Sequence, residues 1–163
     1  MKVVFTGGPG GHFYPIIAVA QELREQLSRE NVRDVAFYFV ADDPYKKEVL
    51  DHNNIEFKQI KTGKLRIYFS LQNLIDIFKT LKALLVSFFW LYRLYPDVVF
   101  SKGSYASFPF TFAALLLRIP VIIHESDSVP VRANKYAGSF AKRIAVSFPG
   151  AKDHFPPDKV ALT

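Results

Sequence analysis

The stretch that decides the fold is "KVVFTGGPGGHFYPIIAVAQEL", residues 2–23. Its first five residues are rich in β-branched and aromatic side chains, which predicts a strand. A glycine-rich turn follows this strand, and apolar residues then recur at helical spacing as far as Leu27. Strand, tight turn and helix in this order form the first unit of a parallel α/β sheet. The turn contains Gly7, Gly8, Gly10 and Gly11.

The rest of the chain repeats this alternation, with strands expected at 35–40, 55–60, 97–101, 120–125 and 143–147. Helices are expected between them, at 43–53, 71–95, 106–119 and 132–140. Continuous apolar strands that alternate with helices predict a parallel sheet covered on both faces. We therefore expect an α/β, Rossmann-like doubly wound domain at 1–150. The tail 151–163 contains two adjacent prolines and is expected to begin an interdomain connector.

Composition narrows the possible partners. The chain has 163 residues, no cysteine and a formal net charge of +6, so it has no disulfide or thiolate site. A basic surface with 16 phenylalanines and eight tyrosines favours an anionic membrane or a phosphorylated ligand. We expect no nucleic-acid partner. The N-terminus turns glycine-rich too soon for a signal peptide, which predicts a cytoplasmic fold.

Three loops at strand ends carry the residues that are suited to chemistry. They are "GGPGGH" (7–12), "SKGSYASFP" (101–109) and "HESDS" (124–128). The carboxyl ends of parallel strands lie on one edge of a sheet, so we expect these loops to meet there and form a ligand site.

The glycine loop has two interpretations. Glycines let a ligand approach the backbone, and N–H groups at a helix start attract phosphate; the alternative is a plain tight turn. The stretch is not a P-loop, and Phe13 stands where the dinucleotide motif needs its last glycine. Asp42 and Asp43 end the second strand, where an acid could hold a ribose, so a nucleotide-cofactor oxidoreductase stays an alternative.

His12 enters the first helix and is a candidate general base, or else a packing residue at the helix start. His124 and Glu125 are neighbours on a strand, so we expect only one of them to face the cleft. Glu125 could orient a substrate hydroxyl or a histidine, or bind loop N–H groups. His52 and His154 are expected on the surface. No histidine–carboxylate set has metal-ligand spacing, so no metal site is predicted.

These loops resemble the N-terminal half of the MurG family of N-acetylglucosaminyltransferases. The first loop is similar to the family's GGTGGH, and 96–109 to PDVV…GGYVSGP. Residues 119–137 resemble IPVVLHEQN…N, and 148–151 match the close of the family's first domain. The similarity covers nearly the whole chain in order and spacing.

The resemblance implies a GT-B fold, with two Rossmann-like domains, of which the C-terminal UDP-sugar domain is absent here. It implies inverting transfer of N-acetylglucosamine from UDP-N-acetylglucosamine, bound mainly by the absent domain, to an undecaprenyl-diphosphate-linked acceptor (lipid I to lipid II) in peptidoglycan synthesis. No cofactor is implied, and the role of a divalent cation stays open. The implied catalytic residues are His12 and Glu125, and the implied binding residues are Gly7, Gly8, Gly10, Gly11, Gly103, Ser104, Tyr105, Asp127 and Asn134.

Some positions depart from the family pattern. Pro9 replaces a threonine, Ser104 and Phe108 replace glycines, and Ser126 and Asp127 replace the glutamine and asparagine of HEQN. An acid in place of an amide puts that contact in doubt, so a related transferase with another acceptor stays open. A non-catalytic membrane-anchor subunit of a split polysaccharide glycosyltransferase is a further alternative.

The helix expected at 71–95 is apolar on almost every side. Its mainly apolar run without a charged residue, 83–92, is too short to cross a bilayer, which takes roughly 20 residues. We expect peripheral docking on the cytoplasmic face of the cell membrane; the alternative is a helix buried on the sheet. The predicted docking residues are Leu74, Phe78, Lys79, Lys82, Leu85 and Phe89, with Lys61, Lys64 and Arg66 in the basic rim.

Overall fold

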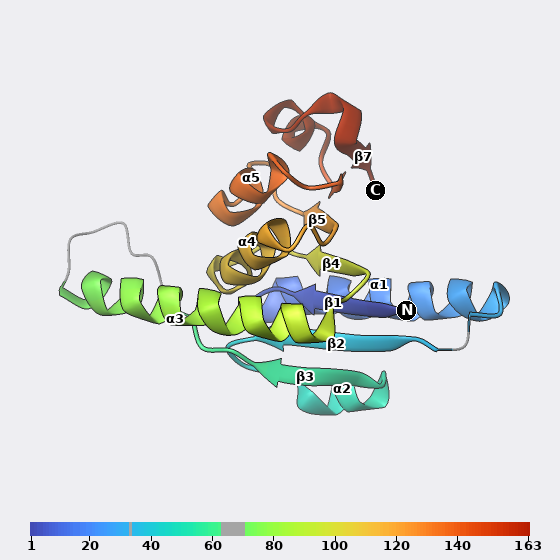
Figure 1. Ribbon diagram of the computed structural model, residues 1–163. Helices are drawn as coiled ribbons and strands as arrows, with labels where there is room; N and C mark the ends of the chain where they lie inside the picture. The colour runs from blue at the N-terminus through green and yellow to red at the C-terminus, as the bar shows by residue number, and fades with distance from the viewer. Residues whose placement is uncertain (33, 63–70) are drawn as a thin grey trace.

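The computed structural model describes residues 1–32, 34–62 and 71–163, except for the side chains of 71–76. Its strands form one parallel sheet in the order β3-β2-β1-β4-β5-β6-β7 (Figure 1). The strands are β1 Lys2–Thr6, β2 Ala36–Ala41, β3 Ile55–Gln59, β4 Val98–Ser101, β5 Val121–Glu125, β6 Arg143–Val146 and β7 Val160–Leu162.

Helices cover both faces of the sheet, as its continuously apolar strands require. A core around Phe5, Phe13 and Leu50 lies between the sheet and the helices α1 and α2. A second core around Val99 and Phe110 lies under α3, α4 and α5. The helices are α1 Phe13–Arg29, α2 Lys47–His52, α3 Leu71–Leu94, α4 Phe108–Leu116 and α5 Arg132–Gly138. The predicted doubly wound fold is confirmed.

The strand order reverses between β1 and β4, which pair in parallel from Val3–Val98 to Thr6–Ser101. The chain leaves β1 toward one face of the sheet and leaves β4 toward the other. The two loops therefore separate above the strand ends, and ligands of open α/β sheets bind in the crevice between such loops.

The tail differs from the expected connector. Ala151 and Phe155 are buried, and β7 extends the sheet by pairing with β6 from Ile144–Val160 to Val146–Leu162. The prolines belong to two short 3₁₀ turns, Pro149–His154 and Pro157–Lys159, so they do not form an extended linker. The folded unit therefore reaches past the expected boundary at residue 150.

Helix α3 has one buried side and one exposed side, and the exposed side is also apolar. Ala83, Ser87 and Leu91 lie on its buried side and are at most 1% exposed. Figure 1 shows the first turns of α3 extending beyond the sheet, past the carboxyl ends of β1, β2 and β3. Among the described residues, no helix has the length and apolar character needed to cross a membrane.

Candidate functional site

The loops after β1 and β4 pack directly on each other. A Cβ on Gly7 would lie 2.9 Å from Ile16 Cδ1 and 3.2 Å from Lys102 Cβ, so a side chain there would press on both α1 and the β4 loop. A Cβ on Gly8 would lie 3.3 Å from Ser104 Cβ. Gly10 and Gly11 lie further out, and a Cβ on either would meet no atom within 4 Å.

The loops after β4 and β5 meet through a buried amide. Asn134, on α5, is 1% exposed and donates from Nδ2 to Glu125 Oε2 at 3.1 Å and to the carbonyl oxygen of His124 at 3.2 Å. Gly103 adopts a φ of +79°, and a Cβ there would lie 2.5 Å from Asn134 Nδ2. The structure thus brings the three predicted loops to one rim.

Glu125 is 2% exposed and holds the loop that follows β5. Its Oε1 accepts from the N–H of Asp127 at 3.0 Å, and its Oε2 accepts from the N–H of Val131 at 2.9 Å. Together with the bond from Asn134, these contacts occupy both carboxylate oxygens. This geometry matches the expected alternative of a carboxylate that binds loop N–H groups, and Glu125 thereby places the exposed Asp127.

His12 is half-buried where the short 3₁₀ turn Gly10–His12 passes into α1. Its Nδ1 lies 3.4 Å from the carbonyl oxygen of Lys102. An Nδ1–H that donates to this carbonyl leaves Nε2 with the lone pair, so the ring can accept a proton at Nε2.

Lys102 is a buried residue of the rim that the predicted site set leaves out. It is 1% exposed, and its Nζ donates to Ser126 Oγ at 2.6 Å. Burial lowers the pKa of this ammonium below its ordinary value, and attraction to Glu125 and Asp127 offsets part of the shift. The sequence feature that could have indicated Lys102 is its position, directly after β4 and before Gly103.

His124 and Glu125 point to opposite faces of the sheet, as expected of strand neighbours. The ring of His124 lies beside Phe100, and its Nε2 is 3.1 Å from Ser147 Oγ. Its Nδ1 is buried and has no hydrogen-bond partner among the described residues. Burial, and secondarily the Lys102 charge, lower the pKa of His124.

Tyr105 and Asp42 join the loops after β4 and β2. Burial first, and then a charge interaction and a hydrogen bond with Asp42, raise the pKa of the Tyr105 hydroxyl. Asp42 Oδ1 also accepts from the N–H and Oγ1 of Thr62, at 2.9 and 2.7 Å. Asp43 Oδ1 accepts from the N–H of Tyr45 at 2.7 Å. Both acids thus stabilise loops at the positions where a dinucleotide fold would hold a ribose.

The predicted docking residues lie on the outer side of α3. Phe78 and Phe89 are each 65% exposed and Leu85 is 60% exposed, and Lys79 and Lys82 are exposed as well. The side chain of Leu74, together with Lys64 and Arg66, lies outside the described residues.

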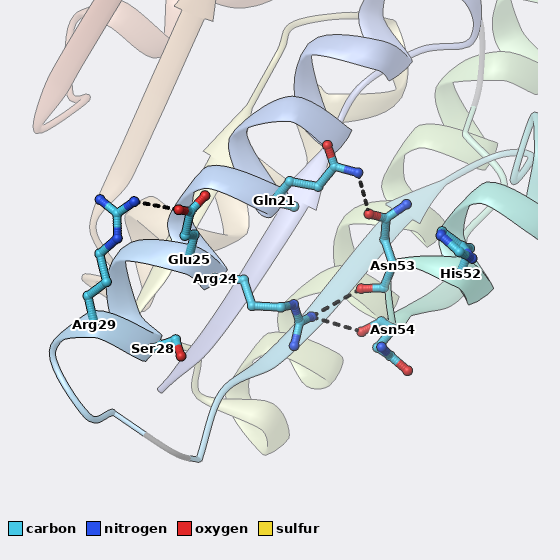
Figure 2. A pocket seen from close by; sticks show the side chains of 9 residues that line it. Gln21, Arg24, Glu25, Ser28, Arg29, His52, Asn53 and Asn54 are labelled. Carbon is cyan, nitrogen blue, oxygen red and sulfur yellow. Dashed lines mark hydrogen bonds and ion pairs between the residues drawn. The ribbon is translucent and has the colours of Figure 1, made fainter.

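A hollow of about 540 Å³ lies elsewhere, between α1 and the turn that joins α2 to β3. Figure 2 shows Arg24 reaching across it to the carbonyl oxygens of Asn53 and Asn54, at 3.1 and 3.3 Å. The guanidinium also lies 4.5 Å above the ring of Phe37. None of the predicted site residues lines this hollow. Many of its polar groups hydrogen-bond to one another, so the hollow is better explained by packing between α1 and this turn than by a ligand site.

The rim therefore offers backbone N–H groups at a glycine turn, a histidine with a free ring nitrogen, and a buried ammonium. Such groups can remove a proton from a hydroxyl and stabilise phosphate charge. Among the described residues, no group of three or more His, Cys, Asp or Glu could hold a metal ion.

Residues 3–146 match the model of the glycosyltransferase family 28 N-terminal domain. The chain is 39% identical over 163 residues to UDP-N-acetylglucosamine–N-acetylmuramyl-(pentapeptide) pyrophosphoryl-undecaprenol N-acetylglucosamine transferase 2 of Bacillus cereus, covering 99% of this chain and 45% of that protein. It is 40% identical over 164 residues to the transferase of the same name from Legionella pneumophila, covering 99% and 44%. The chain thus spans about half the length of these curated relatives.

Solved structures agree with the sequence relatives. The crystal structure of Acinetobacter baumannii MurG superposes with a TM-score of 0.78 at 30% identity, over 99% of this chain and 45% of that chain. The UDP-GlcNAc 2-epimerase of Neisseria meningitidis, with a TM-score of 0.66 at 20% identity over 100% of this chain and 46% of that one, shares the fold alone. The fold is the N-terminal half of a GT-B fold, and the comparisons favour a glycosyltransferase over an oxidoreductase.

Proposed function

Because the chain belongs to the glycosyltransferase family 28 N-terminal domains, we propose that it is the acceptor-binding half of an inverting N-acetylglucosaminyltransferase. The donor is UDP-N-acetylglucosamine, bound mainly by a second domain, and the acceptor is an undecaprenyl-diphosphate-linked sugar of peptidoglycan synthesis. The observation that carries this proposal is the meeting of three family-like loops at the strand-order reversal, where His12 of the first loop contacts the second loop at the Lys102 carbonyl.

The reaction joins an acceptor hydroxyl oxygen to the anomeric carbon of the donor sugar. The bond from that carbon to the UDP oxygen breaks, and UDP leaves with the electron pair. The hydroxyl proton must pass to a base as the new bond forms, and the diphosphate must receive stabilising contacts.

His12 is the proposed base. Its contact with the Lys102 carbonyl supports the Nδ1–H tautomer, which leaves Nε2 to take the proton. The open space around Gly10 and Gly11 supports the approach of a diphosphate to the N–H groups of the turn. Glu125 and Asn134 act through the loop that they hold, while Ser104, Tyr105 and Asp127 lie nearer the surface of the rim.

A lipid-linked acceptor requires the cleft to approach a bilayer, and the exposed side of α3 suits this task. Phe78, Leu81, Leu85, Phe89 and Tyr92 recur at spacings of three and four residues, and each is at least 51% exposed. Such a stripe lies along one face of a helix, and basic neighbours such as Lys82 attract anionic headgroups. We propose peripheral docking at the cytoplasmic face of the membrane through this apolar stripe.

The test compares acceptor binding with sugar transfer. We expect the 163-residue chain to bind a short-chain prenyl diphosphate carrying N-acetylmuramyl-pentapeptide, measured by calorimetry, and to transfer no radiolabelled N-acetylglucosamine from UDP-N-acetylglucosamine. Transfer should require a chain or partner that supplies the second domain. Turnover by the chain alone, or the absence of acceptor binding, would contradict the proposal. Transfer that needs a separately encoded partner would identify a split enzyme.

A further inference from the structure

The ammonium of Lys102 is buried without an opposite charge in contact. Lysines are almost never fully buried unless they are paired. Among the described residues, no carboxylate oxygen lies within 4.0 Å of Lys102 Nζ, and Ser126 Oγ is its hydrogen-bond partner there. A buried charge held by one neutral hydroxyl is costly, so its retention calls for a role.

The Lys102 contact fixes the direction of the Ser126 hydroxyl. An ammonium only donates, so Ser126 Oγ accepts from Lys102, and its own hydrogen must point toward another acceptor. Within the described part of the chain, Ser126 Oγ makes no second hydrogen bond. Ser126 is half-exposed at the end of β5, so the hydroxyl offers an oriented donor to the rim.

Asp127 supplies the complementary acceptor one residue further on. Its backbone N–H is held by Glu125 at 3.0 Å, and its side chain is exposed. The carboxylates of Glu125 and Asp127 both attract the Lys102 ammonium, so this small group holds one positive and two negative charges. A phosphate here would meet the repulsion of Asp127, whereas a neutral sugar matches one donor beside one acceptor.

We propose that Ser126 and Asp127 form a carbohydrate-binding subsite and that Lys102 is the positioning residue that orients the Ser126 hydroxyl. The subsite takes a hydroxyl or carbonyl oxygen of the acceptor sugar at Ser126, and a hydroxyl or amide N–H at Asp127. This inference rests on the proposed acceptor-binding function and adds to it the part of the acceptor that is read at the end of β5.

The experiment uses the 163-residue chain and two probes. One is a short-chain prenyl diphosphate bearing N-acetylmuramyl-pentapeptide, and the other is the same prenyl diphosphate without the sugar. Ser126→Ala should weaken binding of the sugar-bearing probe about tenfold and leave the sugar-free probe unchanged. Ser147→Ala is the matched control, since this serine contacts His124 at the end of the next strand and should alter neither affinity.

Lys102→Met tests the positioning role. This variant should lower the affinity for the sugar-bearing probe about as much as Ser126→Ala does. The double variant should bind that probe no more weakly than either single variant. If Lys102 had only a structural role, Lys102→Met would instead lower the affinity for both probes. If Lys102→Met does not fold in a thermal melt, Ser126→Ala still decides the subsite.

Three outcomes would overturn the subsite. An unchanged affinity of Ser126→Ala for the sugar-bearing probe would remove Ser126 as a contact. Equal losses with both probes would show a phosphate site or a general disturbance of the loop. Equal affinity of the unchanged chain for both probes would leave a diphosphate site with no sugar recognition. Binding of neither probe would instead contradict the proposed acceptor-binding function itself.

Discussion

Gly103 connects the loops of the rim, and its conformation makes a substitution there costly. Its φ of +79° is strained for any residue with a Cβ, and that Cβ would overlap the buried amide of Asn134. Gly103→Ala should lower the free energy of unfolding by about 1–3 kcal/mol from backbone strain, and by more if Asn134 must move. Urea denaturation measures the loss. Gly150→Ala is the control, because a Cβ there meets no atom within 4 Å and should change little.

His12 is the residue whose chemistry matters most to the proposed reaction. In the complete enzyme, His12→Ala should lower kcat by about 10²- to 10⁴-fold, because the acceptor hydroxyl loses its proposed general base. The affinity for the acceptor should change much less. Steady-state transfer assays at several acceptor concentrations separate the two effects, and a near-normal kcat would return His12 to a packing role at the start of α1.

The sequence allowed prediction of the glycine turn and of the position of His12 at the start of α1 from local spacing, and of the meeting of the loops from the parallel sheet. It did not allow prediction of the role of Lys102. A lysine beside a strand end normally reaches solvent. Its burial depends on Gly7 of one loop and Ser126 of another, which are far from it in the chain. Glu125 was equally ambiguous, since only the fold shows that its carboxylate holds backbone N–H groups.

Among the elements, α3 carries the prediction on membrane binding. Phe78→Ser together with Phe89→Ser should weaken binding to vesicles of phosphatidylglycerol and phosphatidylcholine by about tenfold or more, because two exposed rings no longer enter the interface. Sedimentation of the protein with the vesicles measures this. Val32→Ser removes an exposed apolar side chain outside α3 and serves as the control.

The charge contribution of α3 is separable from the apolar one. Added salt should weaken vesicle binding, because Lys79, Lys82 and Arg93 act through screened attraction. Equal binding to vesicles of phosphatidylcholine alone would contradict the electrostatic part. The length of α3 and its exposed positions Phe78, Leu85 and Phe89 were predicted from the sequence, whereas Leu81 and Tyr92 of the same exposed stripe were not among the predicted docking residues. The strand β7 was missed because three residues after a proline pair give too short a pattern.

At the scale of the whole molecule, burial of His124 makes stability depend on pH. Since the pKa of His124 is lower in the folded state than its ordinary 6.5, the unfolded chain binds more protons between these values. The contribution of His124 to the free energy of unfolding is fully present above about pH 6.5 and is lost as the pH falls through the lowered pKa of the folded state. His124→Gln should therefore reduce the difference between urea midpoints at pH 7.5 and 5.5.

The control for that measurement is the exposed His52, whose replacement by Gln should leave the pH dependence of the urea midpoint unchanged. An identical pH dependence in His124→Gln and the unchanged chain would show that the folded state accepts the His124 proton without penalty. Comparing both variants with the unchanged chain separates the contribution of His124 from that of an exposed histidine.

The pairing of β1 with β4 also constrains the order in which the molecule assembles. Val3 lies beside Val98, so the central pair of the sheet cannot form until most of the chain is available, and every other strand pair also needs a crossover. Non-local pairing of this kind slows folding. We expect β1, β2 and α1 to gain hydrogen-exchange protection first during refolding, and the rim around Gly103 and Glu125 to gain it last. A nascent chain in which β1, β2 and β3 have emerged before α3 should therefore expose an apolar sheet face, and we expect a chaperone to bind this face until α3 leaves the ribosome.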